Sequence, residues 1–341
     1  MSVRPSKFNF FSSFAYTTAM GFSPIYLMAP FVLFFTCLTS VRLNRAQVFL
    51  SGIFLIWFVF IVLNAFVGDF HTDYTYKYVF GIFLNILFWF SGCVSVSQGL
   101  KSRWLEFIVF CFVGFDTVFR FSYPSEFSSD IYRFKENSFI FEDSNFVGFF
   151  LLFFAIFRDH VRGSFSFRFD FLVFLLLFLT FSRASLFVYC LYVIVRRISL
   201  NGFLLGGLLL SAVAAGLFLF YDNFFSEIVF AGTFKFNNAS LILSGFFQNL
   251  TLISFFFGHG LGWSSSISGY SAHAYFVEVL VEQGIMAIVF WFSALILSFR
   301  NSRGSAAIFV FMFIIISFSF SPIVAPYLFF FLGVLFTTTD R

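Results

Sequence analysis

The sequence is short of charge, which limits the classes of protein that it can encode. Only 11% of its 341 residues are charged and 60% are hydrophobic, whereas a soluble domain has about 25% charged residues. Mean hydropathy is +0.96. The charges are gathered in clusters between apolar runs, as expected for a chain that crosses a bilayer many times. This composition excludes a soluble globular protein.

Cysteine and metal-ligand patterns are also scarce. The four cysteines, Cys37, Cys93, Cys111 and Cys190, lie inside apolar runs without the spacing of a zinc site or a disulfide framework. No P-loop, dinucleotide-binding motif or GxSxG elbow occurs, so a nucleotide-sugar enzyme is unsupported. The net charge of +4 comes largely from short loops. Membrane topology therefore accounts for the net positive charge, and we expect no nucleic-acid partner.

Long apolar runs, rich in the 68 phenylalanines, make up most of the chain. Phenylalanine inserts into bilayers about as well as leucine, so its abundance has no catalytic meaning. We predict an all-α, polytopic membrane protein with about 12 transmembrane helices in a single membrane domain, residues 1–341. The expected spans are 8–21, 23–41, 46–67, 78–99, 104–121, 145–157, 165–181, 184–199, 203–220, 274–299, 305–320 and 323–337.

The stretch 165–199 reads either as one long helix with Arg183 near its middle or as two short spans that meet at Arg183. Basic residues favour the cytoplasmic side of a membrane protein. With the N-terminus inside as an uncleaved first span, the hairpin places fourteen of the 20 Lys and Arg residues inside. The hairpin is therefore predicted, with two outer segments: a first periplasmic loop at 121–144 and a large periplasmic loop at 221–272. The apolar pieces LILSGFF and LISFFFG of the large loop predict amphipathic helices that lie along the membrane interface.

Basic residues on the outer side oppose this trend and are candidates for binding an anion. Arg183, at the predicted hairpin tip, either reaches lipid headgroups or offers a bidentate fork to a phosphate. Arg120 and Arg133 flank the first outer loop, where each either pairs with acids such as Asp116 or binds a ligand. Lys235 is the only basic residue in the large outer loop, and it is either solvated or part of a site.

A histidine and two acids mark the start of the span at 274–299. His273 precedes a helix N-terminus, whose positive partial charge disfavours imidazolium, so it is either a polar interface residue or a general base. Glu278 and Glu282 are four residues apart and share a helical face, where we expect them to support the site. His259 lies between two glycines and is predicted to shape the loop. Asp143 or Ser144 reads as a helix N-cap.

Three stretches resemble the bacterial O-antigen polymerase (Wzy-type) and O-antigen ligase superfamily. LTFSRASLF, around Arg183, is similar to the family's Ser-Arg element. FGHGLGW is similar to its glycine-rich loop, and HAYFVEVLVEQGI, led by His273, to its histidine-led helix. The residue after the histidine is Ala274, where the family usually has Asn, Ser or Gln. The family's loop arginine is absent, so Lys235, Arg120 or Arg133 would replace it.

The resemblance implies a GT-C-like glycosyltransferase architecture in the bacterial inner membrane, with a metal-independent, cofactor-free and inverting site that faces the periplasm. The donor would be a glycan on undecaprenyl pyrophosphate. Arg183 and a second cation would stabilise the departing pyrophosphate, and His273 would deprotonate the acceptor hydroxyl. A chain-length-regulator membrane protein would be the partner.

Three functions remain open from the sequence. A repeat-unit polymerase would transfer the glycan to a second lipid-linked repeat, and it is favoured by the short chain. An O-antigen ligase would transfer the glycan to lipid A-core. A polysaccharide flippase or transporter would place its charges deep within the spans and show two related halves.

Overall fold

The fold is helical throughout the part of the chain that the structure, a computed structural model, describes. These residues are 3–15, 23–39, 43–67, 75–95, 100–101, 103–126, 133–139, 141, 143–163, 166–197, 224–268, 274–301, 305–317 and 325–337. The helices in them are α1 (Val3–Ser13), α2 (Ile25–Cys37), α3 (Arg45–Val67), α4 (Thr75–Val94), α6 (Arg103–Ser122), α7 (Ser144–Arg162), α8 (Phe167–Leu179), α9 (Arg183–Arg197), α11 (Phe224–Gln248), α12 (Leu252–Phe257), α13 (Trp263–Ser268), α14 (Tyr275–Asn301), α15 (Ser305–Ser317) and α16 (Pro326–Thr337).

Three of these helices have the length and apolar composition needed to cross a membrane: Arg45–Phe66, Ser144–Arg162 and Tyr275–Ser298. Four shorter helices are also apolar: Ile25–Cys37, Tyr78–Val94, Ala307–Ser317 and Pro326–Phe336. The protein is therefore an all-helical membrane protein over the residues described. The expected span 203–220 lies outside those residues.

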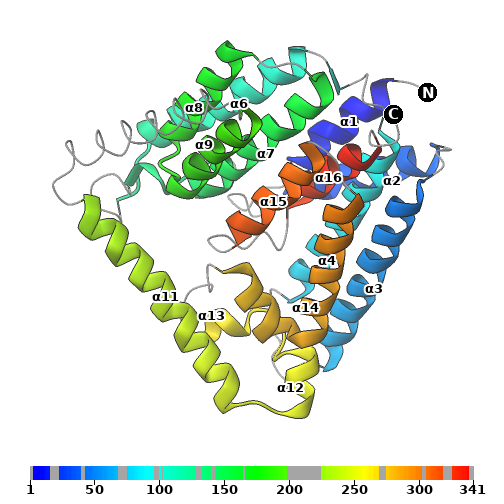
Figure 1. Ribbon diagram of the computed structural model, residues 1–341, viewed down its shortest axis with the longest axis vertical. Helices are drawn as coiled ribbons and strands as arrows, with labels where there is room; N and C mark the ends of the chain where they lie inside the picture. The colour runs from blue at the N-terminus through cyan, green and yellow to red at the C-terminus, as the bar shows by residue number, and fades with distance from the viewer. Residues whose placement is uncertain are drawn as a thin grey trace.

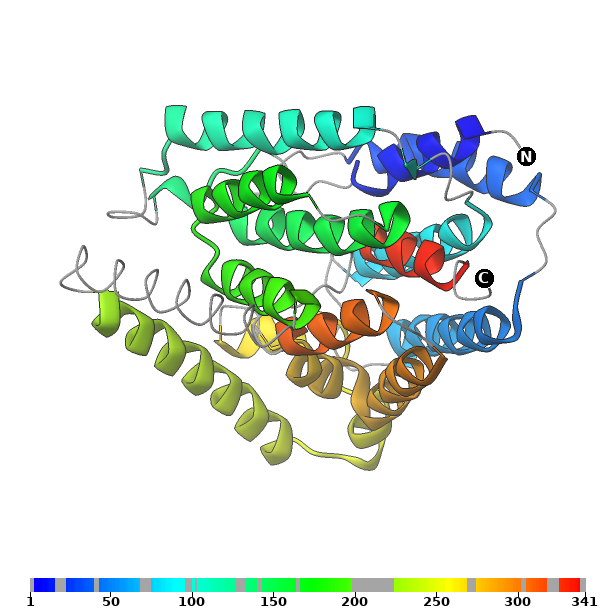
Figure 2. The same cartoon turned by 45° about the horizontal axis from the view of Figure 1, so that its top comes forward.

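The helices form two groups with α15 and α16 between them (Figure 1). Helices α6 to α9 lie together on one side, and α2, α3 and α4 lie on the other. Helix α11 extends away from the bundle as a long arm, and α12 follows it at the far end of the molecule (Figure 1). Turning the molecule shows that α6 runs along one edge of the bundle (Figure 2).

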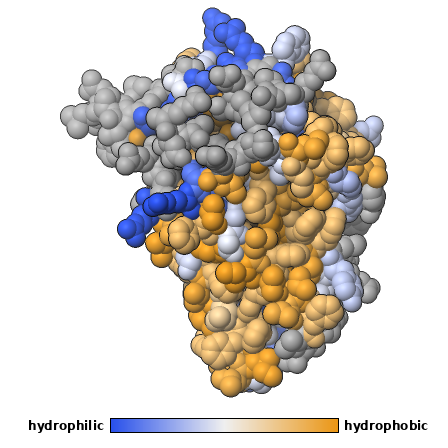
Figure 3. Space-filling view, turned by 90° about the vertical axis from the view of Figure 1, so that its right-hand side faces the viewer, coloured by the Kyte–Doolittle hydropathy of each residue, from blue (hydrophilic) through white to orange (hydrophobic). Residues whose placement is uncertain are grey.

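An apolar outer surface covers the side formed by α2 and α3. Figure 3 shows this face as an almost continuous apolar area, with polar side chains gathered towards one end. Large exposed side chains of α2 and α3 include Phe31, Phe34, Phe49 and Phe66. An apolar patch of this extent is expected only where lipid or another protein covers it, which agrees with a membrane protein.

Helix α7 is the most enclosed of the three long apolar helices and explains many of the phenylalanines. About 83% of its apolar window is buried inside the protein, as expected for a helix that is hydrophobic on all sides. Phe157 stacks on Phe331 of α16 with ring centroids 4.5 Å apart, and Phe153 lies 4.7 Å from Phe309 of α15. The aromatic rings therefore act as core packing.

Helices α4 and α16 approach each other through glycine. A Cβ added to Gly92 would lie 2.3 Å from the Phe330 carbonyl oxygen, and one added to Gly333 would lie 2.5 Å from the Trp89 carbonyl oxygen. Close backbone contact through small residues is a common way to join membrane helices. At the end of this pair, the Asn44 side chain donates to the Phe336 carbonyl at 3.1 Å. The loop before α3 and the end of α16 therefore lie at the same end of the bundle.

Helices α8 and α9 form the predicted hairpin, with a turn at Thr180, Phe181 and Ser182. The predicted N-cap is also present, because the Asp143 side chain accepts from the Asn145 amide at 2.8 Å. The apolar pieces of the large outer segment fall in α11 and α12, so the predicted helices are there. Arg183 thus begins a helix directly after a tight turn.

Candidate functional site

Arg183 is the first residue of α9, and two serines fix the start of that helix. The Ser182 and Ser185 hydroxyls are 2.7 Å apart and buried. They face α7 at Gly148, where an added Cβ would lie 2.7 Å from Ser185 Oγ. The turn before them holds Phe181 at φ 53°, a left-handed conformation that non-glycine residues rarely adopt. Close packing of this turn against α7 therefore fixes the position at which Arg183 begins α9.

Arg120 connects this turn to the first outer loop. Its guanidinium has no solvent exposure and pairs with Asp116 through Nε and Oδ2 at 2.9 Å. It also donates to the carbonyls of Phe134 at 2.7 Å and Leu179 at 3.3 Å. Asp116 accepts a second hydrogen bond from Ser138 Oγ at 2.7 Å. The ion pair therefore ties together α6, the loop and the end of α8.

This geometry decides between the two readings of Arg120. Pairing with Asp116 is confirmed, and the arginine is enclosed by protein groups. The proposed ligand-binding role of Arg120 is therefore replaced by a positioning role. The carbonyls that it holds immediately precede Lys135 on one side and the turn that leads to Arg183 on the other.

Lys135 is a further candidate site residue, which the sequence alone does not indicate. Its carbonyl accepts from the Ser144 amide at 2.9 Å, and the Ser144 hydroxyl donates to the Thr180 carbonyl at 2.5 Å. Ser144 therefore fastens the Lys135 backbone to the turn before Arg183. No local motif marks Lys135, since it is one basic residue in an ordinary polar loop.

Lys135 is partly buried and lies among several charged side chains. Burial lowers the pKa of Lys135 below the ordinary lysine value. Asp143 and Glu136 oppose this shift of the pKa, whereas the positive charge of Arg183 adds to it. Lys135 and Arg183 therefore lie near each other, and the carboxylates of Asp143 and Glu136 are also close to Lys135.

Arg133 and Lys235, the other cations proposed from the sequence, differ in position. Arg133 is exposed, and its guanidinium lies 4.9 Å from the centroid of the Phe134 ring. Lys235 falls on α11, and its side chain lies outside the described part of the chain. Lys135, in contrast, is hydrogen-bonded through its backbone to Ser144, which also contacts the turn before Arg183.

The span predicted over 274–299 is not one straight helix. Gly284 has φ 75° and ψ −177°, which breaks α14. The chain then folds back, because the rings of Tyr275 and Trp291 lie 5.1 Å apart, although one straight helix would separate these residues by roughly 24 Å. Phe276 likewise stacks on Phe292. The predicted span is therefore present as α14, which has the length and apolar composition of a membrane span, but it bends back at Gly284 instead of running straight.

The glycine-rich stretch FGHGLGW packs on this break. The amide of His259 donates to the Val281 carbonyl at 2.9 Å, and the amide of Gly260 donates to the Glu282 carbonyl at 3.1 Å. These carbonyls lose their helical partners where the helix ends, so the loop replaces them. The His259 ring is buried and stacks on Trp263 at 4.4 Å, consistent with the predicted loop-shaping role.

Glu282 holds the start of α13. Its Oε1 accepts from Ser264 Oγ at 2.5 Å and from the Ser264 amide at 3.3 Å. Beside it, the Gln283 side chain accepts from Trp57 Nε1 of α3 at 3.2 Å. Glu278 is also buried within α14. These contacts fit the expected supporting role, with α13 as the partner of Glu282.

His273 lies outside the residues that the structure describes, so its role remains a prediction. The residues that follow it pack against neighbouring helices. Tyr275 is buried against Trp291, and the centroid of its ring is 6.4 Å from that of Phe313 of α15. Phe313 also lies 6.4 Å from Phe153 of α7. Helix α15 thus packs between α7 and the first half of α14.

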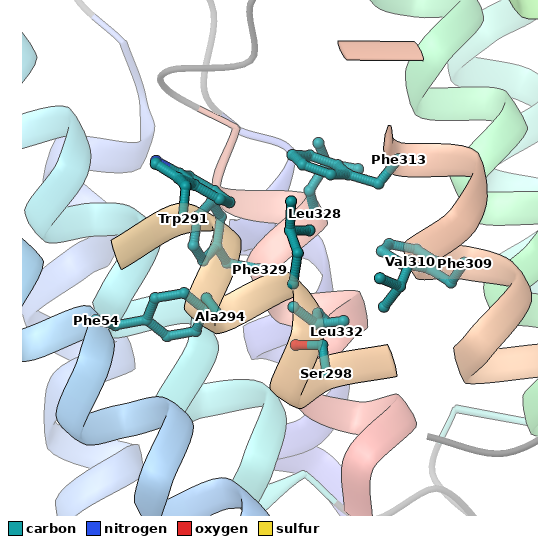
Figure 4. A pocket seen from close by; sticks show the side chains of 11 residues that line it. Phe54, Trp291, Ala294, Ser298, Phe309, Val310, Phe313, Leu328, Phe329 and Leu332 are labelled. Atoms are coloured by element: carbon teal, nitrogen blue, oxygen red, sulfur yellow. The ribbon is translucent and has the colours of Figure 1, made fainter. Parts of the chain in front are cut away.

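An apolar pocket lies between α3, α14, α15 and α16. Figure 4 shows its lining, with Phe54, Trp291 and Phe313 around it and the Ser298 hydroxyl at one end. None of the candidate site residues lines this pocket. It offers no acid or base, so we do not assign the chemistry to it.

No protein-family model matches the chain, and no curated protein matches it either. The family resemblance therefore continues to rest on the motifs around Arg183, His259 and His273. In the described residues, no group of three or more His, Cys, Asp or Glu side chains is placed to hold a metal ion.

Proposed function

We propose that this protein is a membrane glycosyltransferase that polymerises undecaprenyl-pyrophosphate-linked repeat units into a surface polysaccharide. The observation that carries the proposal is that Arg120 and Ser144 hold the Lys135 backbone beside the turn that precedes Arg183, at the end of the α6–α9 group. Two cations held by buried backbone contacts suit a pyrophosphate leaving group, whose negative charge grows in the transition state.

Each cation has a distinct part in this proposal. Arg183 supplies a planar guanidinium that can bind two phosphate oxygens at once. Lys135 supplies a second, more compact positive charge in place of the family's loop arginine. Arg120 sets the separation between them by holding the Phe134 and Leu179 carbonyls. Neutralisation of the departing pyrophosphate by Arg183 and Lys135 would lower the barrier to bond cleavage.

The remaining step is deprotonation of the acceptor hydroxyl. We assign it to His273, as the resemblance implies, because a neutral imidazole can accept a proton near pH 7. The attacking hydroxyl would displace the pyrophosphate from the anomeric carbon with inversion. The interlock of α14 with the glycine-rich stretch would hold the residues after His273 in place.

The finer architecture belongs to the same proposal. We place about 12 spans and a GT-C-like arrangement in a bacterial inner membrane, with the Arg183 end facing the periplasm. Lipid-linked repeat units would reach that side already flipped, and a chain-length-regulator membrane protein would set the final length.

Deletion of the gene and analysis of the surface glycan test the proposal. Loss of a polymerase leaves surface glycans that carry a single repeat. Loss of a ligase leaves unattached polymer on its lipid carrier, and loss of a flippase leaves lipid-linked single repeats on the cytoplasmic side. The first result supports the proposed function, and either of the others contradicts it.

Complementation of the deletion strain then tests the site. Arg183→Ala should fail to restore long chains while reaching wild-type abundance in the membrane. Arg183→Lys should also be poor, because an ammonium lacks the bidentate fork. Arg45→Lys is the matched control, since Arg45 is an exposed arginine at the start of α3, and it should restore long chains fully.

A further inference from the structure

Positive charge gathers at the end of the bundle away from Arg183, where α6 begins and α7 ends. Glu106 in the first turn of α6 pairs with Arg158 at 2.8 Å and with Arg162 at 2.6 Å. Arg158 also pairs with Asp159 at 2.9 Å. One carboxylate thus holds two guanidiniums, which fastens α6 to α7.

The second carboxylate in this region, that of Asp159, also has its partners within the protein. Asp159 accepts from the Tyr192 hydroxyl at 2.6 Å and pairs with Arg196 of α9. Both acids are therefore already shared among arginines. Lys101 and Arg103 are exposed and form no ion pair with any other residue that the structure describes. The region keeps an excess of positive charge.

The excess charge has a defined position. Arg162 donates from Nη2 to the Lys101 carbonyl at 3.2 Å, which holds the residues before α6 against the end of α7. Lys101, Arg103 and the partly exposed edge of Arg162 therefore lie together. Because the arrangement depends on the ion pairs of the partly buried Glu106, it exists before any ligand arrives.

Apolar side chains begin one residue after Arg103. Trp104 is 72% exposed and Phe107 58% exposed, and their rings meet edge to face at 5.9 Å. On α8, Phe167 is 70% exposed and stacks on Phe171. Helix α6 is at the edge of the bundle (Figure 2), and tryptophan beside basic residues is typical of a membrane interface.

We propose that an anionic phospholipid binds at this edge, with its phosphate between Lys101, Arg103 and the exposed edge of Arg162. Its acyl chains would lie along Trp104 and Phe107. The charge complementarity selects an anionic headgroup, and the exposed aromatic side chains beside the charges favour a lipid over a soluble anion. The inference does not depend on glycosyl transfer, because none of these residues belongs to the Arg183 site.

Quenching of Trp104 fluorescence tests this inference directly. The protein is reconstituted in bilayers with phosphatidylglycerol or phosphatidylcholine that carries brominated acyl chains. Trp104 is the most exposed of the five tryptophans, since Trp57, Trp89 and Trp291 are buried and Trp263 is intermediate. The difference in fluorescence between the wild type and Trp104→Phe gives the contribution of Trp104.

Brominated phosphatidylglycerol should quench Trp104 at a mole fraction at least fivefold lower than brominated phosphatidylcholine, as expected for basic side chains at an anionic surface. Lys101→Gln with Arg103→Gln should remove this preference and leave quenching by phosphatidylcholine unchanged. Arg300→Gln, which removes an exposed arginine at the end of α14, should keep the preference. Equal quenching by both lipids, or a preference that survives the double substitution, would overturn the inference.

Discussion

Gly258 and Gly284 meet backbone to backbone, although they belong to different segments of the chain. A Cβ added to Gly284 would lie 2.6 Å from the Gly258 amide nitrogen, and one added to Gly258 would lie 2.3 Å from the Glu282 carbonyl carbon. Both glycines have positive φ, at 76° and 75°. This contact joins the glycine-rich loop to the break in α14.

Alanine at either glycine should destabilise the protein. Gly284 occupies a φ/ψ region that only glycine populates readily, which costs about 1–3 kcal/mol for another residue, and the steric clash adds to that cost. Thermal melting in detergent should show a clear fall in Tm for Gly258→Ala and Gly284→Ala. Gly52→Ala and Gly114→Ala are matched controls, since nothing lies within 4 Å of a Cβ at those helical positions. An equal Tm in all four variants would contradict the interlock.

Loss of one partner of the Arg120–Asp116 pair should be costly, because a buried charge is left without its partner. Such a change typically costs about 3–5 kcal/mol. Arg120→Met and Asp116→Leu should therefore each lower the free energy of unfolding, and the double variant should lose less than the sum of the two. The double-mutant cycle is measured by urea or thermal unfolding in detergent. Additive losses would mean that the pair is not coupled.

The lowered pKa of Lys135 predicts the pH dependence of donor binding. An anion binds best to the protonated amine, which is lost at lower pH than for an ordinary lysine, so affinity should fall earlier on the alkaline side. Lys135→Arg stays charged and should move that fall to higher pH. Titration of lipid-linked donor binding against pH measures the shift. Identical alkaline profiles for the two proteins would remove Lys135 from the site.

The lowered pKa of Lys135 also predicts how the free energy of unfolding changes with pH. The unfolded chain keeps the Lys135 proton up to the ordinary lysine pKa, whereas the folded chain releases it at lower pH. Between these two values the unfolded state binds more protons, so this residue should make stability rise with pH. Lys135→Met should flatten that part of the stability profile, whereas an unchanged slope would show that another group causes it.

Glu282 should behave as a supporting residue. Glu282→Gln keeps an oxygen that can accept from the Ser264 hydroxyl, so most chain extension should remain. Glu282→Ala leaves the α13 start without its partner and should lower Tm together with activity. Chain extension is measured from the length of the polysaccharide. A loss of about 100-fold or more in Glu282→Gln at unchanged Tm would instead indicate an acid–base role.

Local signals explain what the sequence predicted correctly. The α8–α9 hairpin follows from charge counting, because a single helix would strand Arg183 in the bilayer. The Asp143 cap follows from a short acidic side chain just before an apolar run. The apolar pieces within 221–272 predicted helices that now appear as α11 and α12. Each of these features depends on neighbouring residues alone.

Features that depend on distant residues were missed. The break at Gly284 needs the backbone of Gly258 beside it, whereas the apolar pattern on both sides reads as one span. The Lys135 backbone is linked to the turn before Arg183 through Ser144 and Arg120, which are distant from Arg183 in the sequence. Arg120 itself was open between pairing and binding, and its burial among Phe134, Leu179 and Asp116 resolves that choice.

Chain extension by purified protein on a defined undecaprenyl-pyrophosphate-linked repeat tests the central claim most directly. Arg183→Ala should bind the donor more weakly and extend chains about 10²–10³-fold more slowly, as expected when one transition-state contact is removed. His273→Ala should bind the donor like the wild type and yet fail to extend it. Wild-type chain length from Arg183→Ala at equal protein concentration would contradict the claim that this arginine holds the departing pyrophosphate.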